Sequence, residues 1–596
     1  MIQETDYQFA RFFPDKAIQP FAFLLSQKMR EGHICIPVTK DAKETELGEI
    51  SLSNLQKVNN RFLAFTDANV PFVFHEPYLY LQRYYRYETQ VIEWIKERLQ
   101  ISADKKEYYK TLLEPCRALI AAQAADYSLE GLTDEEKTDW QLIAVIRSLM
   151  NEFSIITGGP GTGKTTTLSK LLLILYTLNI NSTVALAAPT GKASMRMLES
   201  LRDKSKSFPK EILEKIKALK PYTLHRLLVN QPNSIHFKHN KENPLPFDWL
   251  IIDEASMIDL PIFAKLLSAC GPSTRLLLLG DKDQLASVEA GSLFGDLCTA
   301  AGEMNRFSAE DRMWMNGFVP DASRQITEKH TTDKNLLLAN CITELRLSHR
   351  FKQQGEIGQL SQAIIGANEE QAIRLLTAEK DRNIHRIDHN NEQAFNEFIR
   401  GYVDFLEEPD IAKALKKLNL LRVLVTVREG ECGLYAINRK IEKALHALRP
   451  ELIRPVAGFY HNRPIIITKN NYEIDLFNGD VGIVRMDPQS NKMRVWFEAG
   501  EGQAGPRAVS PASLGDCETV FAMTIHKSQG SEFKKVMVVL PDTDDNPLLT
   551  RELLYTGITR AIESGIIRGS EECLKAGINK QVERISGIQK RMRQGS

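Results

Sequence analysis

A glycine-rich segment is the strongest sign of chemistry in this sequence of 596 residues. Its residues follow the spacing G-x-x-x-x-G-K-[ST], which is typical of loops that hold the phosphates of a nucleotide. Glycines let successive backbone N–H groups turn onto phosphate oxygens, and the dipole of a following helix favours negative charge. The segment consists of Gly158, Gly159, Pro160, Gly161, Thr162, Gly163, Lys164, Thr165 and Thr166. We predict that Lys164 neutralises the β and γ phosphates of ATP and that Thr165 ligates Mg²⁺.

The residues on either side of this segment support the prediction. The apolar run Phe153 to Thr157 precedes it, and Lys164 to Leu178 has the pattern of an amphipathic helix. A glycine-rich turn that binds nothing is the structural alternative. The order strand, loop, helix argues against that alternative, because it places the loop at the N-terminus of a helix.

Hydrolysis also requires carboxylates close to the metal ion and the attacking water. Asp253 and Glu254 directly follow the apolar run Trp249 to Ile252, which places them at the carboxyl edge of a buried strand. We predict that Asp253 holds the Mg²⁺ shell and that Glu254 accepts a proton from water. Gln284 follows a second apolar run and reaches the same edge, where it is positioned to sense the γ-phosphate.

Two arginines are candidates for stabilising the transferred phosphoryl group. Arg350 lies in the segment SHRF and Arg560 in TGITRA. Phosphoryl transfer spreads negative charge over several oxygens, which a rigid guanidinium fork meets well. A surface ion pair is the alternative for each of them.

The elements that must position these residues form two α/β units. Strand-like runs alternate with helical segments, which indicates parallel sheets covered on both faces. The stretch between the two halves of the second unit has alternating strands and Gly, Asn and Asp turns, which predicts a small inserted β-domain. The predicted fold is α/β. A mostly helical N-terminal domain at 1–115 precedes a first P-loop domain at 116–345, which has a hairpin insertion at about 221–246. A second domain at 346–443 and 517–575 is interrupted by an SH3-like, β-barrel-like domain at 444–516, and a basic tail follows at 576–596.

Composition limits the classes of partner. Lys plus Arg and Asp plus Glu both total 76, so no overall positive field draws the chain to a polyanion, and any nucleic-acid site must be local. The longest apolar stretch is too short to cross a bilayer, and the N-terminus lacks the pattern of a secretory signal. The eight cysteines contain no C-x-x-C pair, which favours reduced core thiols in a cytoplasmic protein.

The order of the motifs resembles that of superfamily 1 helicases. Along the chain they are GGPGTGKTTT, APTGKAS, DEAS, GDKDQL, LSHRF, AMTIHKSQGSEF and LLYTGITRA. A closer resemblance is to the RecD family, the alpha subunit of exodeoxyribonuclease V, through TLHRLL, NPLPFDWLIIDEASMIDL, VREGECGLYAINRKIE and LFNGDVGI. These motifs span about Gln141 to Ala561. The resemblance implies a bacterial, ATP-dependent DNA helicase with two RecA-like domains and ATP bound between them.

The resemblance also assigns residues that spacing alone does not. It implies that Gln141 contacts the adenine edge and that Glu532 binds ribose or couples the two domains. It strengthens the assignment of Arg350 and Arg560 to the ATP site. For single-stranded DNA it points to Pro189, Thr190, Lys192, His225, Asn470, Thr524, His526 and Lys527, with Tyr472 as a further candidate. A packed core histidine is the alternative for His526, and core packing is the alternative for Tyr472.

The resemblance implies 5′ to 3′ movement on single-stranded DNA and partner subunits similar to RecB and RecC, which together process duplex DNA ends. Stand-alone relatives carry N-terminal helix-hairpin-helix repeats that this sequence lacks, so a docking region for partners is favoured over a self-sufficient enzyme. A free-standing DNA or RNA helicase and an ATP-binding module that never moves are the competing hypotheses. Solvated surface charge is the favoured interpretation of the basic tail, with DNA or subunit contact as the alternative for Lys575, Lys580, Arg584, Lys590, Arg591 and Arg593.

Overall fold

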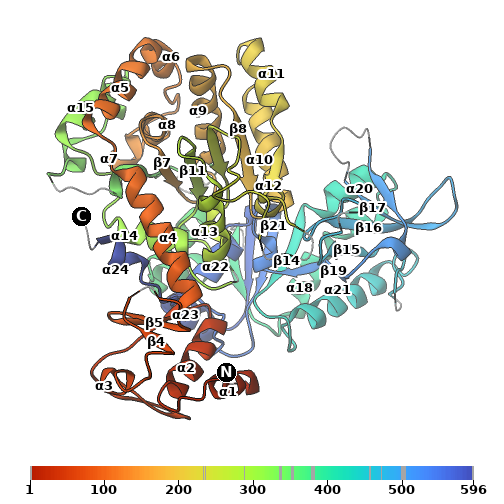
Figure 1. Cartoon of the computed structure of the whole chain (residues 1–596). Coiled ribbons are helices and arrows are strands. Elements are labelled where there is room, and N and C mark those ends of the chain that lie inside the picture. Colours follow the sequence, from red (N-terminus) through yellow and green to blue (C-terminus); the bar gives the residue numbers. More distant parts are fainter. Residues whose placement is uncertain are drawn as a thin grey trace.

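The computed structural model describes residues 3–66, 68–231, 234, 236–287, 289–333, 338–350, 355–377, 383–455, 458–471, 473–498 and 505–593. Over these residues the chain forms two large parallel sheets, a five-stranded antiparallel sheet, and an N-terminal region with a small mixed sheet and a two-stranded antiparallel sheet of β2 (Lys43–Thr45) and β3 (Gly48–Ile50) (Figure 1). The predicted α/β class, with two parallel-sheet domains and an inserted β-domain, is confirmed.

The first sheet has six parallel strands. Their spatial order is β12 (Ile342–Glu344), β7 (Phe153–Thr157), β11 (Arg275–Gly280), β10 (Trp249–Ile252), β8 (Val184–Ala188) and β9 (Pro221–Thr223). Successive side chains of a strand point to opposite faces, so Leu250 and Ile252 enter one core while Trp249 and Ile251 enter the other. Both faces are therefore buried, as a parallel sheet between helical layers requires.

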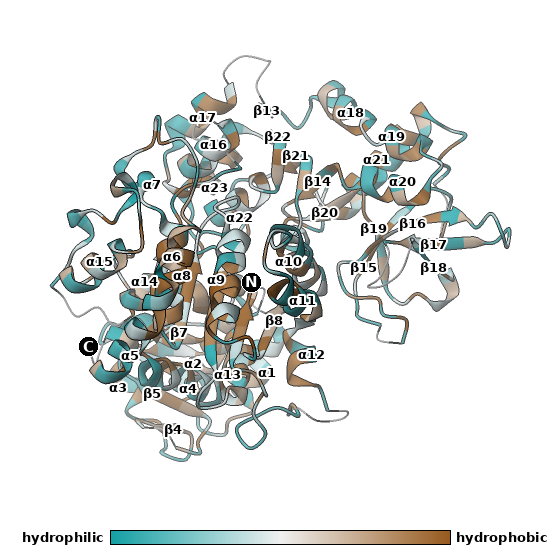
Figure 2. Ribbon diagram, turned by 90° about the horizontal axis from the view of Figure 1, so that it is seen from above, coloured by the Kyte–Doolittle hydropathy of each residue, from teal (hydrophilic) through white to brown (hydrophobic). Residues whose placement is uncertain are grey.

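Helices cover both faces of this sheet. One core contains residues of α4 (Gln82–Leu99), α13 (Leu260–Ala269) and α14 (Leu293–Ala300). The opposite core contains residues of α8 (Trp140–Met150), α9 (Lys164–Leu178), α10 (Gly191–Lys204) and α11 (Lys210–Ala218). Figure 2 shows apolar residues concentrated in β7, α8 and α9, whereas α10 and α11 carry more polar surface.

The second sheet has five parallel strands. Their order is β13 (Ile384–Ile387), β22 (Ala561–Arg568), β21 (Phe533–Val539), β14 (Leu421–Val425) and β20 (Ala522–Thr524). The helices of this part of the chain are α16 (Glu356–Ile365), α17 (Glu369–Thr377), α18 (Glu392–Arg400), α19 (Val403–Glu407), α20 (Ile411–Leu418), α21 (Leu434–Leu448), α22 (Arg551–Ile558) and α23 (Glu571–Asn579).

The inserted sheet is antiparallel and lies to one side of the molecule in Figure 1. Its strands, in spatial order, are β18 (Arg507–Val509), β17 (Met493–Phe497), β16 (Val481–Met486), β15 (Pro464–Ile467) and β19 (Cys517–Thr519). β19 pairs with β15, so this sheet includes three residues that the sequence analysis placed in the second α/β domain.

The N-terminal region combines helices with a four-stranded sheet. The helices are α1 (Glu4–Arg11), α2 (Gln19–Arg30) and α3 (Leu52–Leu55), followed by α4, and the sheet order is β1 (Cys35–Pro37), β6 (Tyr78–Leu81), β5 (Phe72–His75) and β4 (Leu63–Ala64). The aromatic cluster Tyr78 to Tyr87 is split, because its first four residues form β6 and the rest begin α4. Helical residues still outnumber strand residues in the region, in line with the helical character predicted for it.

Two other expectations need correction. The segment expected to start a hairpin insertion at 221 instead begins with β9, whose residues pair with Leu186 to Ala188 as the edge of the first sheet. The basic tail is not simply solvated charge. Arg591 forms an ion pair with the fully buried Glu88, and Arg584 donates hydrogen bonds to two backbone carbonyl groups near α14. In Figure 1 the final helix, α24 (Ile588–Arg593), lies beside α14.

No helix among the described residues has both the length and the apolar character needed to span a membrane.

Candidate active site

The glycine-rich loop joins β7 to α9 and has the conformation that its glycines allow. Gly161 and Gly163 have φ angles of 78° and 88°, in the left-handed region that residues with a side chain rarely adopt. A Cβ atom on Gly161 would lie 2.3 Å from Cβ of Arg350, and one on Gly163 would lie 2.2 Å from Nε2 of Gln141. The loop therefore needs glycine for its backbone conformation and for the close approach of both neighbours.

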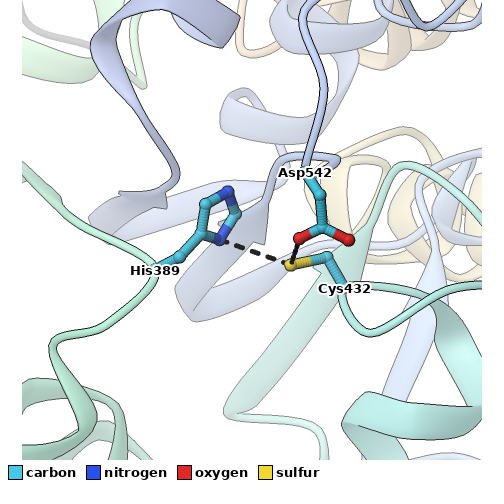
Figure 3. Close-up of side chains that lie close together, drawn as sticks. All are labelled: His389, Cys432 and Asp542. Carbon is cyan, nitrogen blue, oxygen red and sulfur yellow. Dashed lines mark hydrogen bonds between the residues drawn. The ribbon is translucent and has the colours of Figure 1, made fainter.

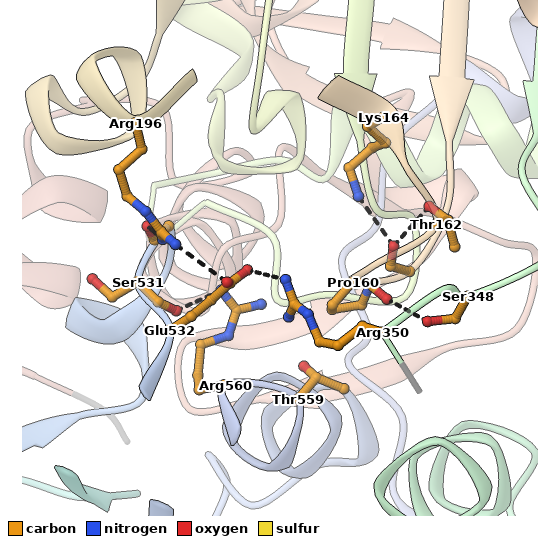
Figure 4. A network of polar contacts seen from close by, with 12 residues as sticks. Pro160, Thr162, Lys164, Arg196, Ser348, Arg350, Ser531, Glu532, Thr559 and Arg560 are labelled. Carbon is orange, nitrogen blue, oxygen red and sulfur yellow. Dashed lines mark hydrogen bonds and ion pairs between the residues drawn. The ribbon is translucent and has the colours of Figure 1, made fainter. Parts of the chain in front are cut away.

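Lys164 is the first residue of α9, and its ammonium group folds back over the loop (Figure 4). Nζ donates to the carbonyl oxygens of Gly158 and Gly159 at 2.7 and 3.3 Å. Backbone carbonyls are weaker partners for an ammonium group than phosphate oxygens, which carry charge. The lysine is thus positioned for a phosphate to take over these hydrogen bonds.

Asp253 and Glu254 follow β10 at the carboxyl edge of the first sheet, as predicted for their position. The backbone N–H of Glu254 donates to Oδ1 of Asp253 at 2.9 Å. Burial and the neighbouring Glu254 raise the pKa of Asp253 to about 6 against the opposing effect of Lys164. The local negative charge is therefore not fully compensated by the chain's own cations. Together with the hydroxyl of Thr165, these carboxylates form an oxygen donor set suited to Mg²⁺.

Gln284 and Asp281 follow β11 at the same edge. Nε2 of Gln284 donates to Oδ2 of Asp281 at 3.0 Å, and the hydroxyl of Tyr555 donates to the same oxygen at 2.9 Å. Burial raises the pKa of Asp281. Since Tyr555 belongs to α22 of the second domain, this carboxylate joins the two parallel-sheet domains at the base of the site.

Arginines from both sides converge on Glu532 (Figure 4). Its carboxylate accepts an ion pair from Arg350 and another from Arg196 of α10, the latter at 3.2 Å. Arg560 is buried beside them. Its Nε donates to the carbonyl of Thr556 at 3.1 Å. Burial lowers the pKa of Arg560, while Glu254 and Glu532 raise it.

Most of these side chains, although not Asp281 or Tyr555, line one cavity of about 660 Å³. Its lining includes the loop residues Pro160, Gly161, Gly163, Lys164, Thr165 and Thr166, the predicted catalytic residues Asp253, Glu254, Gln284, Arg350 and Arg560, and also Gln141, Arg196, Gly530 and Glu532. Residues predicted from motifs hundreds of positions apart thus face the same space.

The predicted adenine contact lies at one end of this cavity. Nε2 of Gln141 donates to the carbonyl of Thr162 at 3.1 Å and lies 3.2 Å from Nε2 of His349. Lys170 donates to Oε1 of Gln141 at 3.3 Å. The sequence analysis missed His349, Lys170 and Arg196 as cavity residues. His349 could have been found as the neighbour of Arg350 in SHRF, whereas a helix lysine and a helix arginine carry no local signal.

The predicted DNA-binding residues lie in four parts of the structure. Pro189, Thr190 and Lys192 stand where β8 leads into α10, and the hydroxyl of Thr190 caps that helix by accepting from the N–H of Ala193 at 3.3 Å. Burial, together with the nearby Arg422 and Arg196, lowers the pKa of Lys192 to about 8. This lysine is therefore a cation without a full counter-charge, which suits contact with a phosphate.

The carboxyl edge of the second sheet carries the other predicted group, Thr524, His526 and Lys527. Thr524 ends β20 and is buried, and its Oγ1 accepts from the N–H of Lys527 at 3.3 Å. Nζ of Lys527 forms an ion pair with Glu518 at 3.0 Å. Burial lowers the pKa of the half-buried His526, and Arg584 lowers it further.

His225 and Asn470 are less clearly placed. His225 lies on α12 (Leu224–Leu228), with its ring 6.0 Å from that of Phe237. Oδ1 of Asn470 accepts from the N–H of Asn478 at 2.8 Å, so it stabilises a turn of the inserted sheet. Tyr472 lies outside the described residues. The loop after Asn470 reaches the first domain, since the ring of Phe477 lies 5.3 Å from the guanidinium of Arg226.

Comparison with known proteins supports the helicase assignment of the two parts of the chain that line the cavity. A family model described as AAA domain matches residues 141–290, and one described as UvrD-like helicase C-terminal domain matches residues 519–565. The RecBCD enzyme subunit RecD of Haemophilus influenzae is 32% identical over 99% of this chain and 97% of its own length. The chain belongs to the RecD family. It is therefore an ATP-dependent helicase, as its motifs predicted.

Other RecD proteins extend the comparison. The RecBCD enzyme subunit RecD of Mycolicibacterium smegmatis is 32% identical over 97% of this chain and 94% of its own length. The ATP-dependent RecD2 DNA helicase of Deinococcus radiodurans is 26% identical over 80% of this chain but only 56% of its own length. Among solved structures, Pif1 helicase from Candida albicans aligns with 77% of this chain at 16% identity and a TM-score of 0.36, a likeness too weak to bear on fold or function.

Proposed function

We propose that this RecD-family helicase hydrolyses ATP to move 5′ to 3′ along single-stranded DNA, as a subunit of a RecBCD-like exodeoxyribonuclease V that processes double-strand ends for recombinational repair. One observation carries the proposal. The loop residue Lys164, the carboxylates Asp253 and Glu254, and the arginines Arg350 and Arg560 line the same cavity although they come from both parallel-sheet domains. A cavity built in this way changes shape whenever the domains move.

The roles proposed for the residues follow from their positions. Lys164 and the loop amides bind the phosphates, and Glu254 accepts a proton from the attacking water. Thr165 and Asp253 would hold Mg²⁺, which when bound neutralises charge on the β and γ phosphates. Arg350 and Arg560 stabilise the charge that develops on the transferred group, as arginine side chains do in related chemistry.

ATP binding and strand movement are proposed to be coupled through domain closure. The DNA candidates Thr190 and Lys192 stand at the end of β8 in the first sheet, and Thr524 and Lys527 stand at the end of β20 in the second. Closing and reopening the shared cavity changes the distance between these two sets. Alternate grip by the two sets would then advance the strand.

The direct test is a comparison of Lys164→Ala with Lys217→Ala. Lys217 is an exposed lysine of the same domain that pairs with Glu214 on α11, so its loss removes an equal charge outside the lining of the cavity. We expect Lys164→Ala to abolish ATP turnover stimulated by single-stranded DNA, with an unchanged circular dichroism spectrum. An ATPase rate within about threefold of the unchanged chain would overturn the motor proposal and favour an ATP-binding module that does not move.

A free-standing helicase is the second candidate function, because the RecD2 relative is named as a helicase in its own right. Co-expression with RecB and RecC homologues separates the two. We expect the three chains to co-purify and the complex to unwind duplex ends faster than the isolated chain. Full processive unwinding by the chain alone, with no retention of the homologues, would exclude the subunit role. Substrates with one labelled 5′ or 3′ overhang test the polarity, and an RNA preference in the ATPase assay would contradict DNA as the substrate.

A further inference from the structure

Three side chains that the helicase site does not use meet at the carboxyl edge of the second sheet. His389 follows β13, Cys432 lies in the loop between β14 and α21, and Asp542 follows β21. One potential ligand atom from each lies within 4.8 Å of the other two. Figure 3 shows the imidazole, thiol and carboxylate pointing toward one another from three separate loops.

From this cluster we infer a binding site for a divalent transition-metal ion, Zn²⁺ by preference, with Nδ1 of His389, Sγ of Cys432 and a carboxylate oxygen of Asp542 as its three protein ligands. Imidazole, thiolate and carboxylate are the three side-chain groups that bind zinc in proteins. A thiolate and a carboxylate bring two negative charges, which match a divalent cation. Zinc sites with three protein ligands hold water in the fourth position.

The orientation of His389 suits a metal ligand. Its Nε2 lies 3.2 Å from the carbonyl oxygen of Pro541, an acceptor, so this nitrogen carries the ring proton. Nδ1 then presents its lone pair to the sulfur of Cys432, 3.3 Å away. A backbone acceptor on the other ring nitrogen is the arrangement found behind histidine ligands of metals.

In the same geometry the thiol has one proton for two hydrogen-bond acceptors. Sγ of Cys432 lies 2.7 Å from Oδ1 of Asp542 as well as 3.3 Å from Nδ1 of His389. Its single S–H proton can be donated to only one of these two acceptors. A cation placed between the three atoms satisfies all of them at once.

Two of the three separations between ligand atoms are close to those of a zinc site. With bond lengths of about 2.3 Å to sulfur and about 2.0 Å to nitrogen or oxygen, a tetrahedral site separates its ligand atoms by about 3.5 Å. The sulfur lies 3.3 and 2.7 Å from its two neighbours, so these two separations need to grow by less than about 1 Å. The third pair, His389 and Asp542, lies within 4.8 Å. Cys432 is buried and His389 half-buried, whereas Asp542 is exposed, which leaves one side open for the ion and its water ligand.

The nearby basic side chains pair with another carboxylate rather than with the three proposed metal ligands. Arg568 and Lys440 both form ion pairs with Oε1 of Glu392, at 2.8 and 2.5 Å. Burial and Asp542 raise the pKa of Cys432 to about 12, so the metal-free thiol keeps its proton at neutral pH. Zinc binding should therefore release that proton to solvent and become stronger as the pH rises.

A metal here would join three loops of the second domain. The loop that carries Cys432 also carries Arg428, which forms an ion pair with Glu518, and Glu518 in turn pairs with Lys527. The ion would therefore restrain a segment connected to a proposed DNA contact. The ion would take no part in ATP hydrolysis, because the cluster lies outside the lining of the nucleotide cavity.

The test uses the full-length chain, without nucleotide, and Zn²⁺ or Co²⁺ as the probe. We expect about one equivalent of tightly bound zinc, and with Co²⁺ the absorption band of a thiolate ligand. Cys432→Ser and His389→Gln should each weaken zinc binding by more than about tenfold. Cys573→Ser is the matched control, because Cys573 is a buried thiol of the same domain whose Sγ lies 3.5 Å from the carbonyl of Pro541. It should bind zinc as the unchanged chain does.

A second measurement needs no substitution and so does not depend on the variants folding. Zinc should slow alkylation of Cys432 by more than about tenfold while alkylation of the half-buried Cys517 is unaffected. Failure of the unchanged chain to bind zinc at micromolar concentration, or equal zinc binding by the ligand variants and the control, overturns the proposal. These readouts do not involve ATP or DNA, so they are independent of the proposed helicase function.

Discussion

Replacing Arg591 by methionine should release the C-terminal segment from the body of the protein. After α23 of the second domain, this segment returns to the first domain and the N-terminal region. Arg591 forms an ion pair with Glu88 at 3.0 Å, with side-chain exposures of 10% and 0%. The segment thus links the second domain to the first domain and the N-terminal region, and this ion pair attaches it to α4.

The expected loss of stability can be worked out from the partners of Glu88. Removing one partner of a buried ion pair costs about 3 to 5 kcal/mol, because the other charge stays buried. Glu88 would keep two donors, the N–H of Gly587 at 2.9 Å and the hydroxyl of Tyr80 at 3.0 Å, which favours the lower end of this range. A loss of about 3 kcal/mol raises the population of the released segment by about a hundredfold.

Hydrogen exchange measures that population. The amides of Ile585 and Gly587 donate to His33 and Glu88, so they are protected only while the segment is docked. Their exchange should accelerate by about a hundredfold in Arg591→Met. Lys590→Met is the matched control, since the neighbouring Lys590 is exposed and contacts only a backbone carbonyl among the contacts described for it. Adding Glu88→Gln to Arg591→Met should restore part of the protection. Unchanged exchange in Arg591→Met would show that the ion pair does not hold the segment.

Three further outcomes are expected. Arg560→Ala should lower kcat for ATP by about a thousandfold with little change in KM, and a loss below tenfold in steady-state assays would contradict its role. Burial raises the pKa of Asp296, which accepts from Ser586, to about 6 from 3.8. The native state therefore binds this proton more tightly than the unfolded chain, and stability is lost as the pH rises from about 4 to about 6. Asp296→Asn should remove that loss and stabilise the protein at pH 8 by up to about 3 kcal/mol in denaturant titrations, whereas a destabilised variant would refute the sign. Gly163→Ala should abolish nucleotide binding in fluorescence titrations, whereas Gly302→Ala, also at positive φ but with open space around it, should not.

Local sequence patterns were sufficient to predict the elements whose structure depends on one segment alone. The predicted strand Phe153 to Thr157 and helix Lys164 to Leu178 have the bounds observed for β7 and α9, because an apolar run, a glycine loop and a leucine-rich segment follow one another. The amphipathic character expected of α9 is not observed, since Leu171 to Tyr176 are all buried. The run before Asp253 was equally clear and forms β10. Since the carboxyl ends of parallel strands lie at the same edge of a sheet, these predictions already placed Asp253 and Glu254 close to the glycine-rich loop.

Contacts between distant segments could not be predicted in the same way. The partner of Arg591 is Glu88, 503 positions away, and an arginine in a basic tail looks like surface charge until that partner is known. β9 is only three residues long and acquires its strand character from pairing with β8. The cluster of His389, Cys432 and Asp542 has no close spacing in the sequence, so cysteine spacing gave no sign of it.

Helix α10 offers a physical route between the nucleotide cavity and the proposed DNA contacts. Lys192 lies in its first turn, and Arg196, four residues later on the same face, pairs with Glu532 of the second domain at the cavity. A helix of this length moves as a unit, because its backbone hydrogen bonds resist internal bending. Any change in the position of Glu532 as the domains close therefore acts on Arg196 and shifts Lys192 with it. The resemblance assigned Glu532 to ribose or to coupling, and its two ion pairs with Arg196 and Arg350 favour coupling, since a carboxylate held by two arginines is not available to ribose until the cavity rearranges.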